Sequence, residues 1–266
     1  MQQALMPMPS LISSRDNAFV KDLRRLVHAS TEYRKQQRFW AEGEHLVRAA
    51  MIRGTPPVIG VFSESFWPVA PAEYAHAAPE NIVITDALYA TISALESPAR
   101  MGFVFDLPAM PTLQTTCATV ILDRVQDAGN VGSILRSASS FGFGQIIALK
   151  GTAALWSPKV LRAGMGAHWG LQLIESAEQE LLQQLAIALC VTSSHQGHFL
   201  HKLLSDKELV MPCAWAFGHE GQGICAALQQ RANQHVRIAQ PGGEESLNVA
   251  AAAAICLHAS ATARLG

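Results

Sequence analysis

The sequence predicts an α/β fold whose larger, C-terminal part is built on a parallel sheet. From residue 118 onward, apolar runs of strand length alternate with helical patterns, as happens when helices cover both faces of parallel strands. Hydrophobic residues make up 49% of the 266 residues and charged residues 15%, which supplies a sizeable core and excludes a disordered chain. At roughly 150 residues per domain, the length fits one large domain or two smaller ones.

The N-terminal part is predicted to be a smaller α/β domain. Its expected helices are Asn17–Ala29, Glu44–Ile52 and Ala87–Leu95, and its expected strands lie in PPVIGVFSE and ENIVITD. The segment Phe105–Thr116 that follows contains two prolines and has no periodic pattern. We therefore expect a first domain at residues 1–107, a linker at 108–116 and a second domain at 117–266.

The C-terminal part shows the clearest alternation of elements. Its expected strands are 118–123, 145–149, 171–175, 190–194, 213–218 and 235–240. Its expected helices are Val131–Phe141, Lys159–Ala167, Glu178–Ala188 and one that begins near Leu247. The third of these helices is predicted to be amphipathic, because one side would carry Leu181, Leu182, Leu185 and Leu189.

Charge is balanced over the whole chain but not along it. Twenty Lys and Arg face 21 Asp and Glu, so a polyanion would have to bind a local patch. Residues 15–53 hold nine basic and five acidic side chains, an excess of four positive charges. This basic stretch is either a solvated helix face or a polyanion-binding surface. Tyr33, Phe39 and Trp40 lie among its basic residues, where they either stack on an unpaired base or pack in the core.

The composition is that expected of a cytoplasmic protein. Five widely spread cysteines without a CxxC pair indicate reduced thiols. The N-terminal residues lack a basic start followed by an apolar stretch, so we expect no signal peptide. The apolar run Val249–Leu257 is too short to span a membrane. No metal site is expected, because His195, His198 and His201 would spread around a helix.

Ligands of open parallel sheets bind beyond the carboxyl ends of the strands, where three loops of this chain are unusual. The first loop places Asp123 and Asp127 at a strand end, and Asn130 where a helix N-cap is expected. Arg136 follows six residues later and would face the same cavity if the first helical turn bends inward. The alternative is a capped helix with a solvated arginine.

The other two loops combine glycines with polar side chains. The segment WAFGHEGQGI places Glu220 among three glycines, which let backbone amides approach a ligand closely. The alternative for this segment is a glycine-rich turn. In the third loop Ser246 is the expected N-cap of the last helix, and Glu244 and Glu245 suit a helix N-terminus. The alternative for this loop is a sequence that only caps the helix.

In this order the three loops resemble the motifs of the SpoU/TrmH-like RNA ribose 2′-O-methyltransferases, which belong to the SPOUT class. The first motif corresponds to DRVQDAGNVGSILRSASSFG, the second to FGHEGQGI and the third to SLNVAAAAA. SPKVLRAGMGAH is similar to the family's segment between the first two motifs. The basic stretch, from Ser14 onward, more loosely resembles the family's substrate-binding domain, which has a ribosomal L30e-like fold.

The resemblance implies an S-adenosylmethionine-dependent enzyme that methylates a ribose 2′-hydroxyl in tRNA or rRNA. Its methyltransferase domain would contain a deep trefoil knot that binds the cofactor, and the protein would work as a homodimer. The family's catalytic and third-motif polar residues correspond here to Asn130, Arg136, Glu220, Ser246 and Asn248. The positions that hold the cofactor, largely through backbone contacts, correspond to Gly218, Ile238 and Leu247.

Two alternatives and two departures from the family pattern accompany this interpretation. A non-catalytic RNA-binding protein on the same fold would assist ribosome assembly or shield RNA; a metabolite-binding dimer would not need the basic stretch. His219 stands where the family commonly has Asn. Ile238-Ala239-Gln240, followed by Pro241, stands where the family often has Ile-Pro-Met.

The chemistry of Arg136 limits its role. Because a guanidinium stays protonated, Arg136 is better suited to act as a forked hydrogen-bond donor to a phosphate or ribose oxygen than as a base.

Overall fold

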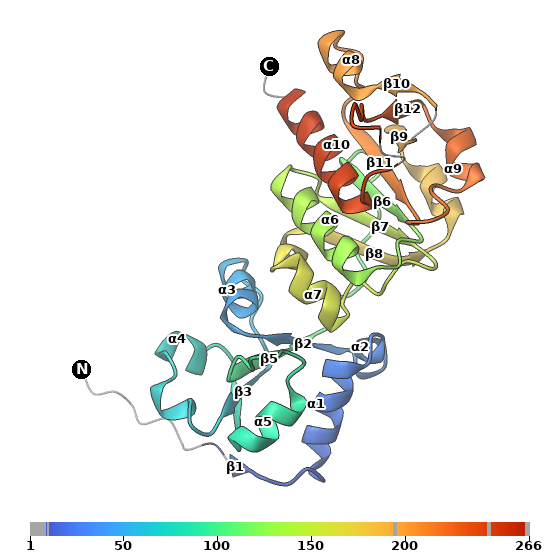
Figure 1. Cartoon of the computed structure of the whole chain (residues 1–266). Coiled ribbons are helices and arrows are strands. Elements are labelled where there is room, and N and C mark those ends of the chain that lie inside the picture. The colour runs from blue at the N-terminus through green and yellow to red at the C-terminus, as the bar shows by residue number, and fades with distance from the viewer. Residues whose placement is uncertain (1–8, 10, 194–195, 244–245, 264–266) are drawn as a thin grey trace. The chain divides into compact units, whose positions relative to one another are not determined.

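The computed structural model describes residues 9, 11–193, 196–243 and 246–263 (Figure 1). The expectations for Ser194, His195, Glu244 and Glu245 therefore concern residues outside the described part. The chain divides into two compact units, Met1–Pro108 with Trp156–Pro158, and Ala109–Leu155 with Lys159–Gly266. We call them the N-terminal unit and the C-terminal unit.

The N-terminal unit is built on a five-stranded mixed sheet in the order β1-β4-β3-β5-β2. β1, β4 and β3 are parallel, whereas β5 runs antiparallel to its neighbours β3 and β2. The strands are β1 (Leu11–Ile12), β2 (Arg38–Glu42), β3 (Ile59–Ser63), β4 (Glu80–Ile84) and β5 (Met101–Asp106). The helices are α1 (Ala18–His28), α2 (Glu32–Gln36), α3 (Glu44–Ile52), α4 (Ala72–Ala75) and α5 (Asp86–Ile92), with a 3₁₀ turn η1 at Trp67–Val69.

The helices predicted for this unit are confirmed as α1, α3 and α5. α1 begins where expected because the side chain of Asn17 accepts a hydrogen bond from the backbone N–H of Phe19, 2.9 Å away. α5 ends at Ile92, earlier than predicted, because Ser93 adopts an extended backbone conformation. The short strand β1 was not predicted from the sequence, and neither were two longer strands, β2 and β5.

These two strands show how the aromatic residues of the basic stretch are used. Phe39 of β2 pairs in register with Phe105 of β5, and their rings stack with centroids 5.3 Å apart. Phe105 thus belongs to a core strand, and the prediction that an irregular segment begins there was wrong. Tyr33, Phe39 and Trp40 are all buried, at 3% exposure or less. They pack in the core, so base stacking by these side chains is excluded.

The C-terminal unit is built on a seven-stranded sheet in the order β10-β12-β9-β11-β6-β7-β8. All its described strand pairs are parallel, which confirms the predicted α/β class. The strands are β6 (Thr119–Asp123), β7 (Gln145–Leu149), β8 (Gln172–Ala177), β9 (Ala188–Thr192), β10 (His198–Phe199), β11 (Cys213–Gly218) and β12 (Gln234–Arg237). The helices are α6 (Ala128–Ser140), α7 (Pro158–Gly164), α8 (Leu200–Ser205), α9 (Ala226–Arg231) and α10 (Val249–Ala263), with 3₁₀ turns η2 (Ala167–Gly170) and η3 (Gln179–Gln184).

β11 is covered on both faces, which explains its uninterrupted apolar sequence. On one face Ala214 and Ala216 belong to a core cluster that includes Leu182 of η3 and Leu228 of α9. Trp215 points to the opposite face, where its indole N–H donates a hydrogen bond of 2.9 Å to Ser260 of α10. α10 also packs against α6, and Figure 1 shows the two helices together on that face.

The predicted helix Glu178–Ala188 was wrong. Only the 3₁₀ turn η3 forms there, and the chain enters β9 at Ala188. Leu182 and Leu189 both join the apolar cluster that contains Ala214 and Ala216, Leu182 from the turn and Leu189 from the strand. The leucines have helical spacing in the sequence, but they reach the same core from two different elements.

Other expectations concern the membrane, metals and the knot. Among the helices of the described part, none combines the length and hydropathy that crossing a membrane requires. Within the same residues, no group of three or more His, Cys, Asp or Glu side chains is placed to hold a metal ion. The deep trefoil knot stays a prediction.

Candidate active site

A cavity of about 320 Å³ lies at the carboxyl edge of the parallel sheet. Its walls come from the ends of β9, β11 and β12 and from the start of α10. Six of the eight site residues predicted from the sequence line it: Gly218, Glu220, Ile238, Ser246, Leu247 and Asn248. The second and third motif therefore meet at one cavity, as expected when parallel strands end at the same edge.

Glu220 ties the second motif to the first. Its carboxylate accepts hydrogen bonds from the backbone N–H groups of Gln126 and Asp127, at 3.3 and 3.1 Å, and from the side-chain amide of Asn130 at 3.1 Å. Partial burial would raise the pKa of this carboxyl group, but the hydrogen bonds from Asn130 and the backbone outweigh burial and lower it. Glu220 is therefore ionised at neutral pH and serves as an anchor for N–H donors.

Asn130 connects all three motifs. Its Nδ2 donates to Glu220, and its Oδ1 accepts a hydrogen bond of 2.9 Å from Nδ2 of Asn248. The prediction that Asn130 is the N-cap was wrong, because α6 begins at Ala128 and Asp127 caps it by accepting from the backbone N–H of Asn130 at 2.7 Å. Asn130 therefore lies in the first helical turn, and its side chain is not used for capping.

The N-cap of α10 also differs from the predicted residue. Oδ1 of Asn248 accepts hydrogen bonds from the backbone N–H groups of Ala250 and Ala251, at 2.9 and 3.2 Å. Asn248 is thus the N-cap, and the prediction of Ser246 was wrong. Capping by Oδ1 leaves Nδ2 of Asn248 to donate to Asn130, so the cap also orients the site.

Arg136 is not brought to this cluster. At about 100° per residue, six residues of helix turn a side chain about 240° from Asn130, and α6 is one continuous helix from Ala128 to Ser140. The Arg136 side chain is exposed and makes no hydrogen bond or ion pair with any residue that the structure describes. The expectation that Arg136 and Asn130 face one cavity within the chain was therefore wrong.

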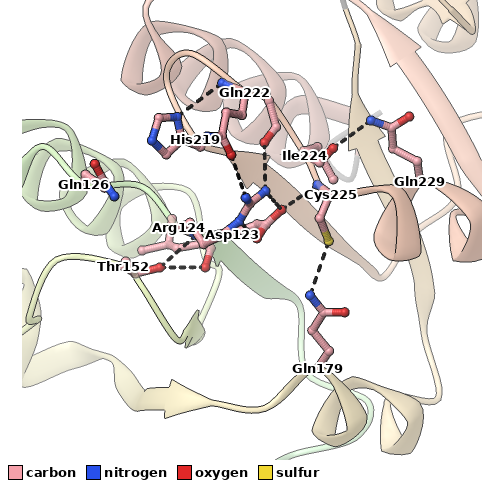
Figure 2. Close-up of polar contacts among 12 residues, drawn as sticks. Asp123, Arg124, Gln126, Thr152, Gln179, His219, Gln222, Ile224, Cys225 and Gln229 are labelled. Atoms are coloured by element: carbon pink, nitrogen blue, oxygen red, sulfur yellow. Dashed lines mark hydrogen bonds and ion pairs between the residues drawn. The ribbon is translucent and has the colours of Figure 1, made fainter.

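The loop Gly218–Ile224, which we call the second-motif loop, is held by residues that the sequence analysis did not assign (Figure 2). The carboxylate of Asp123 accepts the backbone N–H of Cys225 at 2.6 Å and pairs with Arg124 at 2.8 Å. Burial would raise the pKa of Asp123, but the bonds from Arg124 and Cys225 lower it. The sequence places Asp123 as an acid at a predicted strand end, whereas no local pattern indicates a role for Arg124.

His219 shapes the same loop from within. Its Nδ1 accepts the backbone N–H groups of Gly221 and Gln222, at 2.9 and 3.2 Å, which requires the neutral imidazole with its proton on Nε2. Its carbonyl oxygen accepts the N–H of Gly223 at 2.8 Å. An asparagine side chain would offer an acceptor oxygen in the same role, so the departure from the family pattern keeps the chemistry of the turn.

Known proteins resemble both the motifs and the fold. Residues 118–258 match the SpoU rRNA methylase family. RlmP of Bacillus subtilis (strain 168), a 23S rRNA (guanosine(2553)-2′-O)-methyltransferase, is 27% identical over 250 residues, covering 93% of this chain and 97% of RlmP. A solved RNA 2′-O ribose methyltransferase is 25% identical with a TM-score of 0.80, covering 97% of this chain and 100% of that chain.

A second solved structure extends this likeness. It is a putative RNA methyltransferase of the TrmH family from Porphyromonas gingivalis, 28% identical with a TM-score of 0.76, covering 94% of this chain and 98% of that chain. The family match alone takes in more than half of the sequence. The chain belongs to the SpoU rRNA methylase family.

Proposed function

We propose that this protein transfers a methyl group from S-adenosylmethionine to a ribose 2′-hydroxyl in tRNA or rRNA. The proposal depends on the junction of the three motifs, where Glu220, Asn130 and Asn248 form one hydrogen-bonded chain beside the cavity. A transfer site needs such a junction, because donor and acceptor must be held in line. The named relatives, RNA ribose methyltransferases by their descriptions, support the reaction class.

The cavity fits the proposed cofactor in size and lining. Its volume of about 320 Å³ lies at the lower end of the range of small-molecule sites. Apolar side chains of Ile224, Val236 and Ile238 suit a purine ring, and Gly218 and Leu247 bring backbone to the same space. S-adenosylmethionine supplies a methyl group on a sulfonium, which is activated for transfer.

The side chains would then position the acceptor and stabilise charge. Glu220 holds Asn130, and Asn130 in turn holds Asn248 at the edge of the cavity. Arg136, exposed on α6, donates its forked N–H groups to a phosphate or ribose oxygen of the RNA. The 2′-oxygen bonds to the methyl carbon as the S–C bond breaks, S-adenosylhomocysteine leaves, and the hydroxyl proton passes to solvent. A positive charge at Arg136 lowers the cost of the alkoxide that develops on the 2′-oxygen. A non-catalytic RNA-binding protein would need none of these residues, so their joint presence favours the enzyme.

Methyl transfer to RNA tests the proposal directly. The purified protein is incubated with methyl-labelled S-adenosylmethionine and with tRNA or rRNA from cells that lack it, and 2′-O-methylated nucleotides are mapped. We expect label at a defined ribose in one RNA class, consistent with a cytoplasmic enzyme. RNA that gains no 2′-O-methyl group, under conditions where the protein binds it, would favour the non-catalytic alternative.

The N-terminal unit is proposed to be the RNA substrate-binding domain, with the L30e-like fold. Of the nine basic side chains of this stretch, all but the half-buried Arg24 are exposed. Several of them pair with acids of the same unit, among them Lys21–Asp16, Arg25–Asp22, Lys35–Glu32 and Arg38–Asp106. Exposed pairs of this kind contribute little to stability and are screened by salt. Phosphate groups can therefore replace the carboxylates as partners at small cost.

Replacing Arg34, Lys35 and Arg38 together by Ala is expected to weaken RNA binding and to reduce its salt dependence. Each lost phosphate contact removes roughly 0.7 to 0.9 from the log–log salt slope. Binding is measured at several salt concentrations, with affinity for S-adenosylhomocysteine as the internal control that stays unchanged. If the triple variant binds RNA like the parent at low and high salt, Lys159 and Arg162 of α7 become the candidates.

His219→Asn is expected to keep the affinity for S-adenosylhomocysteine within about threefold, since the amide oxygen replaces Nδ1 as the acceptor. His219→Leu removes the acceptor and leaves two backbone N–H groups without a partner, so affinity should fall about tenfold. Calorimetry on the folded variants measures both. Equal affinity of the parent and the Leu variant would mean that the loop does not need this acceptor.

We also propose a homodimer that packs through α10. This helix is rich in Ala, which permits close helix approach, and its Ile255 is 41% exposed although the opposite face packs on α6 and β11. Light scattering at micromolar concentration should give a dimer, and Ile255→Asp should shift it toward monomer. A monomeric parent protein with intact methylation would contradict this.

A further inference from the structure

We infer that Arg124 is a positioning residue for the methyl-donor site, because it holds the second-motif loop in the shape that forms one wall of the cavity. The inference rests on the proposed function for the identity of the ligand. It does not involve contact between Arg124 and the ligand, because Arg124 does not line the cavity. Arg124 acts on two loop residues, Gln222 and Gly223.

The backbone of Arg124 is held in an uncommon conformation. Its φ is +61°, in the left-handed region that is disfavoured for residues with a Cβ atom. The neighbouring loop compensates: the N–H of Arg124 donates to the hydroxyl of Thr152 at 3.1 Å, and that hydroxyl donates to the carbonyl of Leu122 at 2.9 Å. Gly151 leaves room for the arginine, since a Cβ there would lie 3.1 Å from Cγ of Arg124.

This conformation aims the guanidinium at two partners simultaneously (Figure 2). Toward β6, Nε and Nη2 donate to the two carboxylate oxygens of Asp123 at 2.8 and 3.2 Å. Toward the loop, Nη1 donates to Oε1 of Gln222 at 2.9 Å, and Nη2 lies 3.5 Å from the carbonyl oxygen of Gly223. Only a forked, planar donor can bind both sides at these distances.

Asp123 makes this connection rigid. Its side chain is 1% exposed, and a carboxylate so buried needs charged or N–H partners. It takes them from Arg124 and from the backbone N–H of Cys225, which stands at the N-cap position of α9 directly after the loop. The loop is therefore fixed at its exit by Asp123 and near its tip by Arg124.

The cavity depends on this fixation. Gly223 and Ile224 line it, and their backbone packs so closely on Gly218 that a Cβ on Gly218 would lie within 2.3 to 2.5 Å of it. Releasing Gln222 and Gly223 from Arg124 would let the tip of the loop move away from Gly218, although Asp123 still holds its exit at Cys225. A ligand held through backbone contacts in this loop would then have to restore the closed form at its own cost.

The test removes the forked guanidinium of Arg124 without adding strain to its left-handed backbone. Arg124→Asn suits the left-handed conformation but cannot bridge the loop, so affinity for S-adenosylhomocysteine should fall about 10- to 100-fold, as for lost charge-assisted hydrogen bonds. Arg124→Lys, which can pair with Asp123 but has no fork, should restore only part of it. Hydrogen exchange of the backbone amides of residues 219–224 should accelerate in both variants, with or without ligand.

A second pair of variants separates positioning from stability. Lys150→Asn removes an exposed cation that pairs with Glu178 at the same sheet edge, and it should change neither affinity nor loop exchange. Gln222→Ala should weaken binding in the parent but add nothing to Arg124→Asn, because both act through one contact. If Arg124→Asn does not fold, the affinity and loop exchange of Gln222→Ala alone test whether the contact between Arg124 and Gln222 supports ligand binding.

Parent-like affinity and loop exchange in a folded Arg124→Asn protein, or additive effects of the two changes, would overturn the inference. The proposed function can fail separately. A parent protein that binds S-adenosylhomocysteine but methylates no RNA would refute the enzyme and leave Arg124 as a positioning residue. Loop exchange that depends on Arg124 without any ligand affinity would refute the cofactor alone.

Discussion

Gly218→Val is expected to reduce affinity for S-adenosylhomocysteine by about 100-fold or more, the largest effect of any single change at the cofactor site. A Cβ at this position would lie 2.3 Å from the carbonyl carbon of Gly223 and 2.4 Å from the backbone nitrogen of Ile224. These are backbone atoms, so no side-chain rotation relieves the contact. A side chain at this position therefore displaces the loop, so Gly218→Ala should also weaken binding strongly.

Gly221 supplies the matched control on the same loop. A Cβ there would be 3.8 Å from the imidazole of His219, an ordinary contact, and the backbone of Gly221 is not left-handed. Gly221→Ala should therefore bind S-adenosylhomocysteine like the parent in calorimetry. A folded Gly218→Val protein with unchanged affinity would remove Gly218 from the cofactor site.

Arg136→Ala should lower the methylation rate by about 100-fold while leaving cofactor affinity unchanged. The side chain is exposed on α6 and outside the cavity, so it can act on RNA without touching the methyl donor. Arg136→Lys should recover only part of the rate, because a point charge does not reproduce two parallel N–H donors on one phosphate.

Single-turnover rates with saturating RNA separate this effect from weaker RNA binding. Lys202→Ala, which removes an exposed cation from α8, controls for the loss of one positive charge from the same unit. A parent-like rate in Arg136→Ala would exclude Arg136 from the active site. Loss of cofactor affinity in the same variant would instead indicate a role in the fold of α6.

The sequence by itself determined the parallel sheet and the location of the cavity. Strands such as β6, β7 and β11 are buried on both faces, so their apolar runs are visible without any knowledge of their neighbours. Because parallel strands end at one edge, the loops after β11 and β12 had to meet. This rule and the family motifs identified six residues of the cavity lining.

Secondary structure was predicted wrongly where one residue pattern runs across two elements. β2 was hidden because Arg38 and the preceding cations face solvent while Phe39 and Trp40 turn inward. The leucines of Glu178–Ala188 have the spacing of a helix but reach the core from a turn and a strand. Local spacing cannot tell which partner a side chain will meet, and here the partner decided the element.

Only the tertiary structure decided how the site is held. Arg124 meets Gln222 across 98 residues, Cys225 meets Asp123 across 102, and Asn248 meets Asn130 across 118. Because Asp127 caps α6, the side chain of Asn130 is left for the site, and the helical turn between Asn130 and Arg136 directs Arg136 away from it. Such hydrogen bonds depend on where folding places distant backbone and side-chain atoms, which no local pattern of residue types encodes.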